Sequence, residues 1–209
     1  MFNTTIATQI YAKICFEATN SQKKIIENLS EYLSDDDFSR IFVLNGFAGT
    51  GKTTLIAAVV AALKELRIKP VLLAPTGRAA KVLARYCGEQ ALTIHKRIYR
   101  QRTNADYESK FSLDFNREQG AVFIVDEASM LSDSTGDGAL FGSGSLLEDL
   151  VSYVRSGRGC RLILVGDSAQ LPPVGCDFSP ALDPATVSRY GEVVYGLMDE
   201  VVRQQMQSG

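Results

Sequence analysis

Cysteine, histidine and tryptophan are scarce in this chain. The small number of cysteines and histidines argues against a structural metal site. The 209 residues contain four cysteines, one histidine and no tryptophan. Cys15, Cys87, Cys160 and Cys176 form no C-x-x-C pair, and His95 has no second histidine beside it. Because structural zinc is held by clusters of these residues, the sequence argues against a zinc site and predicts free thiols.

Long hydrophobic runs are also missing. The longest nearly uncharged run, residues 53–63, is too short to cross a bilayer. Residues 1–10 are mostly polar and do not have the pattern of a signal peptide. We therefore expect a cytoplasmic protein with no membrane partner. A hydrophobic content of 45% in 209 residues is enough for the core of one large α/β domain.

The charge is unevenly distributed along the chain. The formal net charge is −2, which does not by itself indicate a nucleic-acid-binding protein. Residues 78–110, however, contain eight basic and three acidic residues, a local balance of +5, so the remainder carries −7. Such a stretch is compatible with a surface that binds phosphates, although it is often only a solvated face.

The clearest motif lies within residues 41–64, where an apolar run is followed by three glycines in six residues and then by a helical pattern. Gly46, Gly51, Lys52 and Thr53 fit G-x-x-x-x-G-K-[ST], the phosphate-binding loop, in the strand–loop–helix context that it requires. The glycines let backbone N–H groups turn toward one anion, and the helix adds its dipole. We expect Lys52 to reach the β- and γ-phosphates and the Thr53 hydroxyl to hold Mg²⁺. The alternative is a plain glycine turn between strand and helix. The predicted nucleotide-binding residues are Gly46, Phe47, Ala48, Gly49, Thr50, Gly51, Lys52, Thr53 and Thr54.

A second strand–helix junction follows. Residues 70–74 form a short apolar run, and Thr76 can cap a helix that Gly88 closes. Thr76, Gly77 and Arg78 are therefore expected at the carboxyl edge of a parallel sheet, where backbone N–H groups suit phosphate. The alternative is one more capped helix without a ligand.

Two further apolar runs deliver polar side chains to the same predicted edge. Residues 121–125 lead to Asp126 and Glu127, and residues 161–165 lead to a segment that contains Gln170. We expect Asp126 to hold the Mg²⁺ shell and Glu127 to orient and deprotonate the attacking water. Gln170 can hydrogen-bond a γ-phosphate or its water.

The alternation of strands and helices predicts an α/β fold, a P-loop parallel sheet of about five strands with helices on both faces. A small β-hairpin is expected as an insertion over residues 98–118, with alternation at Phe111, Leu113 and Phe115 and a turn over 103–106. The remaining predicted elements are a helix over 22–33 capped within 19–21, a helix over 146–154 and a strand over 193–197.

Taken in order, these motifs resemble those of the first RecA-like motor domain of superfamily 1 helicases, in the RecD-like and Dda-like branch. The resemblance covers residues 19–205 and rests on seven segments. They are residues 19–22 (Q-motif), 46–53 (motif I), 74–80 (motif Ia), 93–96 (the next motif), 126–130 (motif II), 166–175 (motif III) and 202–204 (motif IV).

The resemblance implies roles that the residues alone do not give. ATP and Mg²⁺ are the implied cofactors, with Gln22 recognising adenine. Arg203 joins Lys52, Glu127 and Gln170 as the implied catalytic set, and the motif III strand lies between the other two. Single-stranded DNA is the implied partner, with translocation from 5′ to 3′ and the hairpin in the place of a strand-separating pin. The implied DNA contacts are Pro75, Thr76, Gly77, Arg78, Thr93, His95 and Lys96.

A complete motor of this kind needs a second RecA-like domain, which we do not find in residues 1–209. We expect a single monomeric domain with an N-terminal extension over residues 1–18, and a chain that looks like a fragment. It should bind ATP–Mg²⁺, hydrolyse it slowly and not unwind DNA alone. Two alternatives belong to other classes. A small nucleotide kinase would need an acceptor site and an arginine-rich lid, and neither is found. A nucleotide-gated binding module, or another P-loop ATPase without helicase activity, remains the second interpretation.

Overall fold

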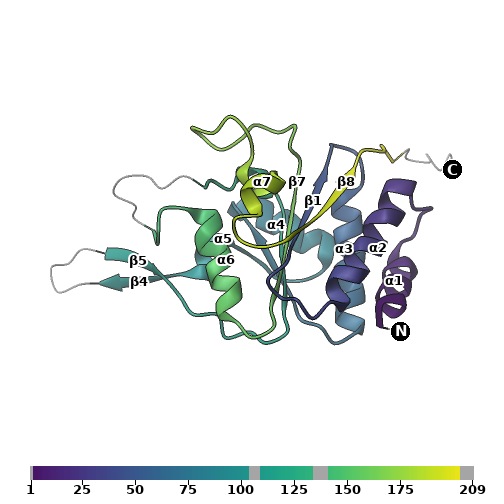
Figure 1. Cartoon of the computed structure of the whole chain (residues 1–209), viewed down its shortest axis with the longest axis horizontal. Coiled ribbons are helices and arrows are strands. Elements are labelled where there is room, and N and C mark those ends of the chain that lie inside the picture. Colours follow the sequence, from purple (N-terminus) through teal and green to yellow (C-terminus); the bar gives the residue numbers. More distant parts are fainter. Residues whose placement is uncertain (1, 104–108, 134–140, 203–209) are drawn as a thin grey trace.

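Six parallel strands form the central sheet of the computed structural model, which describes residues 2–103, 109–133 and 141–202. The spatial order is β3-β2-β6-β7-β1-β8 (Figure 1). Every pair of neighbouring strands in this sheet is parallel. The strands are β1 (Ile41–Gly46), β2 (Pro70–Ala74), β3 (Ala91–Thr93), β6 (Val122–Val125), β7 (Arg161–Gly166) and β8 (Val193–Met198).

The predicted parallel sheet is confirmed, but the count of about five strands is wrong by one. β3 has only three residues, all of them half-buried, and so lacks the long apolar run that identifies the other strands. The helix that follows it was also not predicted. The position of β7 between β6 and β1 agrees with the order that the resemblance implied.

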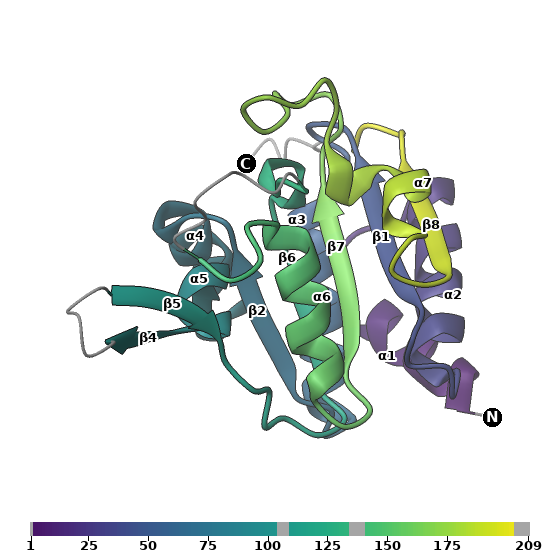
Figure 2. The ribbon, with the colours of Figure 1, turned by 60° about the vertical axis from the view of Figure 1, so that its left-hand side comes forward.

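Helices cover both faces of the sheet because each strand alternates its side chains between them. Phe42 and Leu44 point to the face covered by the first four helices, whereas Ile41 and Val43 point to the opposite face. Two hydrophobic cores result, one on each side (Figure 2). The first face carries α1 (Phe2–Lys13), α2 (Asn20–Ser34), α3 (Lys52–Glu65) and α4 (Gly77–Cys87), and the second carries α5 (Ile94–Ile98), α6 (Leu146–Ser156) and α7 (Pro184–Val187).

Helix α1 occupies most of residues 1–18, the predicted N-terminal extension. Ile6 and Ile10 are buried, and the helix packs against α2 and α3. Their spacing of four residues places both on one helical face. The extension is therefore part of the first hydrophobic core.

The predicted hairpin is present and projects from the body of the molecule (Figure 1). Strands β4 (Tyr99–Thr103) and β5 (Ser109–Leu113) pair antiparallel, while the centre of the predicted turn lies outside the described residues. Phe115 was expected to continue the alternation, but β5 ends at Leu113. The Asp114 N–H donates to the Ile98 carbonyl at 2.7 Å, which extends the pairing of the two strands by one step beyond Tyr99 and Leu113 but does not reach Phe115.

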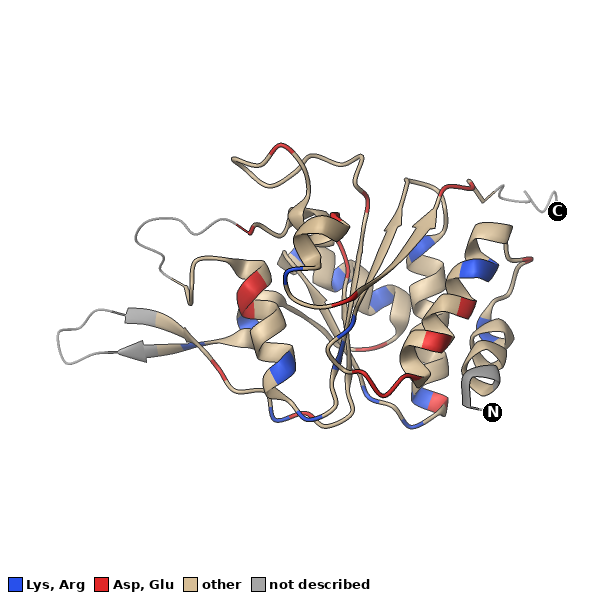
Figure 3. Cartoon of the chain, viewed as in Figure 1, with Lys and Arg blue, Asp and Glu red and all other residues tan. Residues whose placement is uncertain are grey.

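Helix α6 packs beside the hairpin and shows how charge supports local structure. Glu148 and Asp149 lie in its first turn and Arg155 in its last (Figure 3). Both placements stabilise the helix, because negative charge is favourable at the positive end of the helix dipole and positive charge at its negative end. Among the described residues, no helix is long and apolar enough to cross a membrane.

Candidate nucleotide and nucleic-acid site

The phosphate-binding loop connects β1 to α3, and its glycines are required by its geometry. Gly49 and Gly51 have φ angles of +79° and +84°, a region that disfavours other residues. A Cβ atom at Gly46 would lie 2.9 Å from the Cβ of Met198. Thr50 closes the turn by donating from Oγ1 to the Phe47 carbonyl at 2.8 Å. Phe47, Ala48 and Gly49 are exposed at the crest of the loop.

Lys52 is the first residue of α3, and its ammonium lies inside the loop. Nζ donates to the carbonyl oxygens of Gly46 and Phe47, the latter at 2.9 Å, and lies 3.8 Å from Oδ2 of Asp167. Burial lowers the pKa of the ammonium, whereas three carboxylates act to raise it: Asp167, Asp126 and Glu127. The ends of β1, β6 and β7 therefore bring opposite charges together.

Asp126 and Glu127 follow β6 at this edge. Burial raises the pKa of the Asp126 carboxyl, while Oδ1 accepts a hydrogen bond from the Glu127 N–H at 3.0 Å. Glu127 has a φ of 55°, so a non-glycine residue occupies the left-handed region, where strain is usual. Arg67 has a similar φ of 59°, so the backbone conformation does not by itself assign a function, and the catalytic role of Glu127 stays a prediction.

The residues present fit a magnesium ion shared with a nucleotide. No group of three or more histidine, cysteine, aspartate or glutamate side chains among the described residues could hold a metal by itself. Magnesium needs fewer protein ligands, because it commonly uses one or two carboxylates together with phosphate oxygens and waters. The Thr53 hydroxyl, half-buried at the start of α3, and the Asp126 carboxylate offer that donor set.

Gln170 lies in the segment that follows β7. Its Oε1 accepts a hydrogen bond from the buried Ser129 hydroxyl at 3.1 Å, which joins the segments after β6 and β7. The two segments approach closely at Gly166, where a Cβ would lie 3.0 Å from the Ser129 nitrogen. Gln170 itself is exposed and therefore accessible to a ligand at this edge.

Two polar residues at this edge were not predicted as site residues. Asp167 is 4% exposed and approaches Lys52, although it belongs to the motif III segment. Asn45 donates from Nδ2 to the Ser168 hydroxyl at 2.8 Å and to the Tyr195 hydroxyl at 3.0 Å. For Asn45, the sequence offered one signal of a site residue: it is a single amide at the end of an otherwise apolar strand.

The chain beyond β8 crosses the phosphate-binding loop. The Val202 N–H donates to the Gly49 carbonyl at 3.0 Å, and Oε1 of Glu200 accepts from the Ser21 N–H at 2.9 Å. Arg203 lies outside the described residues, so its catalytic role stays a prediction. Its neighbour in the chain nevertheless contacts the loop.

Gln22 is fully buried beneath the same loop. Its Oε1 accepts from the Thr19 N–H at 3.0 Å, and its Nε2 donates to the Thr50 carbonyl at 3.1 Å. Together with the Thr19 hydroxyl, which accepts from the Gln22 N–H, this forms a capping box at the start of α2. Adenine recognition by Gln22 stays a prediction, and it would require the amide to exchange a protein partner for the base.

The predicted nucleic-acid contacts lie at two neighbouring junctions, after β2 and β3. Ala74 and Thr93 are register partners, so the helix starts at Thr76 and Thr93 lie side by side. Each hydroxyl caps its helix, accepting from the Ala79 or Lys96 N–H at 3.2 Å. A Cβ at Gly77 would meet nothing within 4 Å, which leaves room for a backbone to approach.

The remaining predicted contacts differ in their exposure. Arg78 and Lys96 are exposed and, among the described residues, have no ion-pair partner; Pro75 is half-buried beside them. His95 is half-buried, with ring centroids 5.6 Å from Tyr99 and 5.0 Å from Phe141. Burial lowers the pKa of His95. The His95 ring therefore packs against neighbouring aromatic rings, and its contact with DNA stays a prediction.

Comparison with known proteins agrees with this geometry. Residues 17–208 match the protein-family model described as an AAA domain. The chain is 31% identical over 154 residues to the ATP-dependent RecD2 DNA helicase of Deinococcus radiodurans, covering 74% of this chain and 19% of that protein. It is 34% identical over 136 residues to the ATP-dependent DNA helicase dda of Enterobacteria phage T4, covering 63% and 28%. The chain thus spans less than a third of the length of either relative.

A solved structure shows the same fold. The Pif1 helicase from Bacteroides, in complex with ADP-AlF3 and ssDNA, has a TM-score of 0.57 and 19% sequence identity. The match covers 92% of this chain and 44% of that one. The chain therefore belongs to the AAA-domain family, as a RecA-like motor domain of the RecD-like branch of superfamily 1 helicases.

Proposed function

We propose that this chain is the ATP- and single-strand-binding half of a DNA helicase motor. The observation that carries the proposal is the position of Lys52, which lies in the loop with the carboxylates of Asp126, Glu127 and Asp167 around it. A nucleotide's phosphates would take the place of the carbonyl oxygens that Lys52 now contacts. The helicases named among the relatives support the same activity, although each is much longer than this chain.

Each residue at the edge has a distinct proposed role. Lys52 and the loop N–H groups bind the β- and γ-phosphates, while Thr53 and Asp126 hold Mg²⁺. The ion, when bound, offsets negative charge on the phosphates as the γ-phosphoryl group leaves. Glu127 takes a proton from the attacking water, and Gln170 holds that water or the γ-phosphate.

The proposed catalytic set is incomplete in this chain. Arg203 contributes one positive charge, and a second RecA-like domain in a longer protein would contribute another. Because an arginine finger is worth roughly 10³ to 10⁵ in rate, we infer that residues 1–209 bind ATP but hydrolyse it slowly. Translocation from 5′ to 3′ belongs to the complete motor.

Single-stranded DNA would lie over the paired junctions after β2 and β3. Exposed Arg78 and Lys96 offer positive charge there, and the open space at Gly77 admits a phosphate to the start of α4. The four free cysteines are compatible with work in the reducing cytoplasm.

Equilibrium binding tests both halves of the proposal. Lys52→Ala should weaken a fluorescent ATP analogue with Mg²⁺ by about 10- to 100-fold, since bonds to charged groups contribute about 1.5–3 kcal/mol. Arg78→Ala should weaken labelled oligo(dT) and lower its salt dependence by about one unit of slope. Lys24→Ala, an exposed lysine on α2, is the matched control for both.

The same measurements, together with the rate of ATP hydrolysis, distinguish a helicase motor from the alternative function. A nucleotide-gated binding module without helicase chemistry would bind ATP through Lys52, yet Glu127→Gln would leave its slow hydrolysis unchanged. Oligonucleotide binding that is indifferent to Arg78 would count against the DNA surface. Rapid DNA-stimulated turnover by the 209 residues alone would contradict the incomplete catalytic set.

A further inference from the structure

Asn45 is a buried amide near the carboxyl end of β1, and it directly precedes Gly46, the first residue of the phosphate-binding motif. Its side chain lies on the same face of the sheet as those of Ile41 and Val43, because residues two apart on a strand share a face. Only 6% of Asn45 is exposed. Burying an amide costs free energy unless its polar atoms are paired, so the partners of Asn45 indicate its role.

The amide of Asn45 is fully paired, and one partner fixes its orientation. The Ser168 N–H can only donate, so the Asn45 atom that faces it at 3.0 Å is the oxygen Oδ1. Nδ2 then donates one hydrogen to the Ser168 hydroxyl at 2.8 Å and the other to the Tyr195 hydroxyl at 3.0 Å. Both hydrogens of the amide are therefore used.

These three bonds join neighbouring strands at the edge where we propose that the nucleotide binds. β1 lies between β7 and β8, with Asn45 in register with Gly166 on one side and Leu197 on the other. Ser168 follows β7 by two residues, and Tyr195 belongs to β8. All three bonds involve the Asn45 side chain, so the backbone ladder that holds the strands together does not depend on them.

Ser168 belongs to the short turn after β7 that carries Gln170. Within this turn the Ala169 N–H donates to Oδ1 of Asp167 at 2.9 Å, and the Gln170 N–H donates to the Asp167 carbonyl at 3.1 Å. Asn45 holds the same turn from β1, through both the backbone and the hydroxyl of Ser168. Gln170 therefore lies two residues beyond a point that β1 fixes by two hydrogen bonds.

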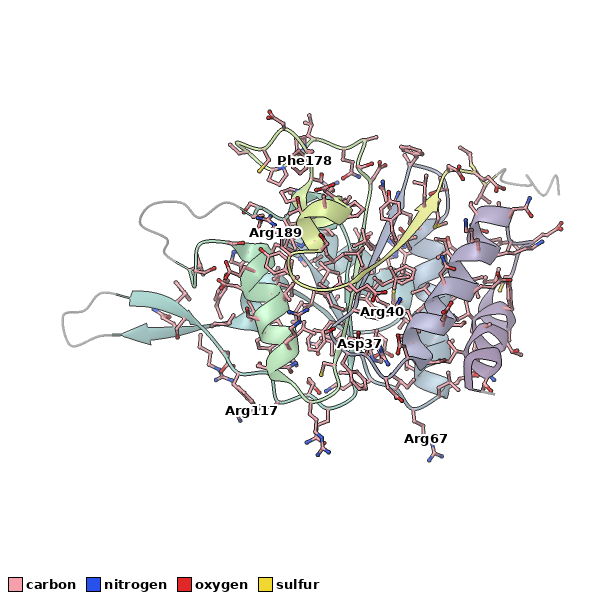
Figure 4. All side chains as sticks on the ribbon, viewed as in Figure 1. Asp37, Arg40, Arg67, Arg117, Phe178 and Arg189 are labelled. Atoms are coloured by element: carbon pink, nitrogen blue, oxygen red, sulfur yellow. The ribbon has the colours of Figure 1, made fainter. Side chains whose placement is uncertain are left out.

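Packing contributes little to the position of the chain beyond this turn. Leu171 and Val174 are 89% and 101% exposed. In Figure 4 the segment that carries Phe178 stands above the sheet. Hydrogen bonds from Asn45 and from the Ser129 hydroxyl hold the start of the segment instead. The position of the turn relative to the sheet therefore depends on these bonds.

Asn45 also lies beside the loop that would hold the γ-phosphate from the other side. The carbonyl of Gly46, its neighbour in the chain, accepts a hydrogen bond from the Lys52 ammonium. That ammonium lies 3.8 Å from Oδ2 of Asp167, in the turn that Asn45 holds. The amide therefore sets the spacing between the loop that carries Lys52 and the turn that carries Gln170.

We propose that Asn45 is a positioning residue for the γ-phosphate. Its amide holds the turn after β7 so that Gln170 meets the γ-phosphate while Lys52 binds it from the loop, and Tyr195 supports the amide by accepting its second hydrogen. The inference rests on the proposed function, because it needs a nucleotide in the loop and Gln170 at its γ-phosphate. The chain would then prefer ATP to ADP partly through Asn45, a residue that does not itself touch the nucleotide.

A structural role is the alternative, in which the amide only closes the end of the sheet. Loss of structural support would weaken ATP and ADP by the same factor, since both occupy the loop. Loss of positioning would weaken only the nucleotide that has a γ-phosphate. The test therefore compares the dissociation constants of fluorescently labelled ADP and of a non-hydrolysable ATP analogue with the same label, both with Mg²⁺.

Asn45→Ala is expected to lower the preference for the ATP analogue over ADP by about 2- to 30-fold, the range of coupling effects for residues that do not contact the ligand. Urea denaturation of each variant measures the loss of stability separately. An equal loss of affinity for both nucleotides would show that Asn45 is structural and would overturn the proposal.

Asn116→Ala is the matched control for Asn45→Ala. The Asn116 amide is 1% exposed, accepts the Glu118 N–H at 3.0 Å and donates to the Val154 carbonyl at 3.2 Å. It also contacts Cys160, which directly precedes β7, so it lies at the opposite end of that strand from the turn. Both substitutions should lower stability in urea, but Asn116→Ala should leave the nucleotide preference unchanged.

Gln170→Ala tests whether Asn45 acts through Gln170. By itself it should lower the preference by about 10- to 100-fold, as expected for one hydrogen bond to a charged group. Adding Asn45→Ala should lower the preference no further, because the turn no longer carries the group that Asn45 positions. Single-turnover hydrolysis of ATP should follow the same pattern. A double variant that multiplies the two single effects would contradict the proposed path.

Tyr195→Phe provides a second variant that keeps Asn45 in place. It removes one acceptor of the amide from a side chain that is 39% exposed, so the fold should tolerate it. The preference should fall in the same direction as in Asn45→Ala but by less, whereas Tyr86→Phe, on the exposed face of α4, should not change it. An unchanged preference in Tyr195→Phe, where Asn45→Ala does not fold, would overturn the assignment.

The two proposals can fail separately. A Gln170→Ala variant with the preference of the wild type removes the proposed role of Gln170 and this inference with it. A Gln170→Ala variant that loses the preference, beside an Asn45→Ala variant that keeps it, removes the role of Asn45 alone.

Discussion

Nε2 of Gln22 donates a hydrogen bond to the carbonyl oxygen of Thr50 at 3.1 Å, so helix α2 supports the phosphate-binding loop directly. The other end of the amide accepts from the Thr19 N–H, and the side chain is fully buried. Both ends are therefore used within the protein. The resemblance assigns Gln22 to adenine, and the two roles lead to different expectations.

The substitution Gln22→Glu distinguishes support of the loop from recognition of adenine. A carboxylate cannot donate to the Thr50 carbonyl, so a buried acceptor is left unpaired, which typically costs about 1–3 kcal/mol. If Gln22 acts as a support, the free energy of unfolding falls by this amount, and ATP and GTP lose affinity by the same factor. Urea denaturation and competition against a fluorescent ATP analogue measure the two effects.

Gln90→Glu is the control for that substitution, because Gln90 is exposed and should leave both quantities unchanged. The contrary result is specific. If Gln22→Glu keeps the stability of the wild type but weakens ATP far more than GTP, the amide reads the base in the bound state, and the bond to Thr50 is dispensable.

Asp126 should make the folded protein less stable at neutral pH than a neutral side chain would. Burial raises the pKa of its carboxyl above the ordinary value of 3.8. Its cost to folding therefore appears as pH rises from 3.8 through the folded pKa and persists above it. Asp126→Asn keeps an acceptor for the Glu127 N–H, so it should raise the urea midpoint at pH 7 without nucleotide.

The gain from Asp126→Asn should disappear as the pH is lowered toward 3.8, where the wild-type carboxyl is also neutral. The same variant should lose the Mg²⁺-dependent part of its affinity for nucleotide. Asp177→Asn, on the segment after β7, supplies a control carboxylate. A midpoint that falls at pH 7 would show that the Asp126 charge stabilises the fold.

Elements with a local signal could be predicted from the sequence. β6 is a continuous apolar run and β1 is one as far as Leu44, and Thr19 and Thr76 cap α2 and α4 as expected. Gly88 adopts a φ of 64° at the end of α4, as a C-cap should. Each of these features depends on a few consecutive residues, so tertiary contacts were not needed to find them.

The contacts between distant segments could not be predicted in this way. Asn45 meets Tyr195 across 150 residues, and Gln22 meets Thr50 only because α2 packs beneath the loop. Strand β3 is too short to have a period of its own, and it forms only because β2 offers it a partner. A motif can identify the loop, but the fold determines which side chains support it.

Gly166 should not tolerate a side chain. A Cβ there would lie 2.9 Å from Leu182 and 3.0 Å from the Ser129 nitrogen, so the segments after β6 and β7 would have to separate. Gly166→Ala is expected to cost about 1–3 kcal/mol, as overpacking usually does. It should also weaken the Ser129–Gln170 bond and slow ATP hydrolysis.

Gly77→Ala is the matched comparison, because a Cβ there meets nothing within 4 Å and its φ is not positive. Its stability should stay the same or rise by about 0.4–1 kcal/mol, since alanine restricts the unfolded chain. A loss of oligo(dT) affinity in Gly77→Ala would then report close approach of a DNA backbone. Equal stability of Gly77→Ala and Gly166→Ala would contradict the packing argument.

The Tyr99 hydroxyl donates to Oδ2 of the buried Asp149 at 2.6 Å and fastens the base of the hairpin to α6. Tyr99→Phe keeps the ring but leaves this carboxylate oxygen with only the Ser143 N–H, at 3.0 Å, so unfolding should become easier by about 1–3 kcal/mol. Tyr86→Phe removes a hydroxyl from an exposed tyrosine and should change stability by less than about 0.5 kcal/mol.

Adding Asp149→Asn to Tyr99→Phe should recover part of the loss in stability, because the unpaired charge is then gone. A double variant whose loss equals the sum of the two single losses would mean that Tyr99 and Asp149 do not stabilise each other. The hairpin would then be held by its other contacts, which include the rings of Tyr99, Phe111 and Phe141 and the bond from the Gly142 N–H to the Phe111 carbonyl.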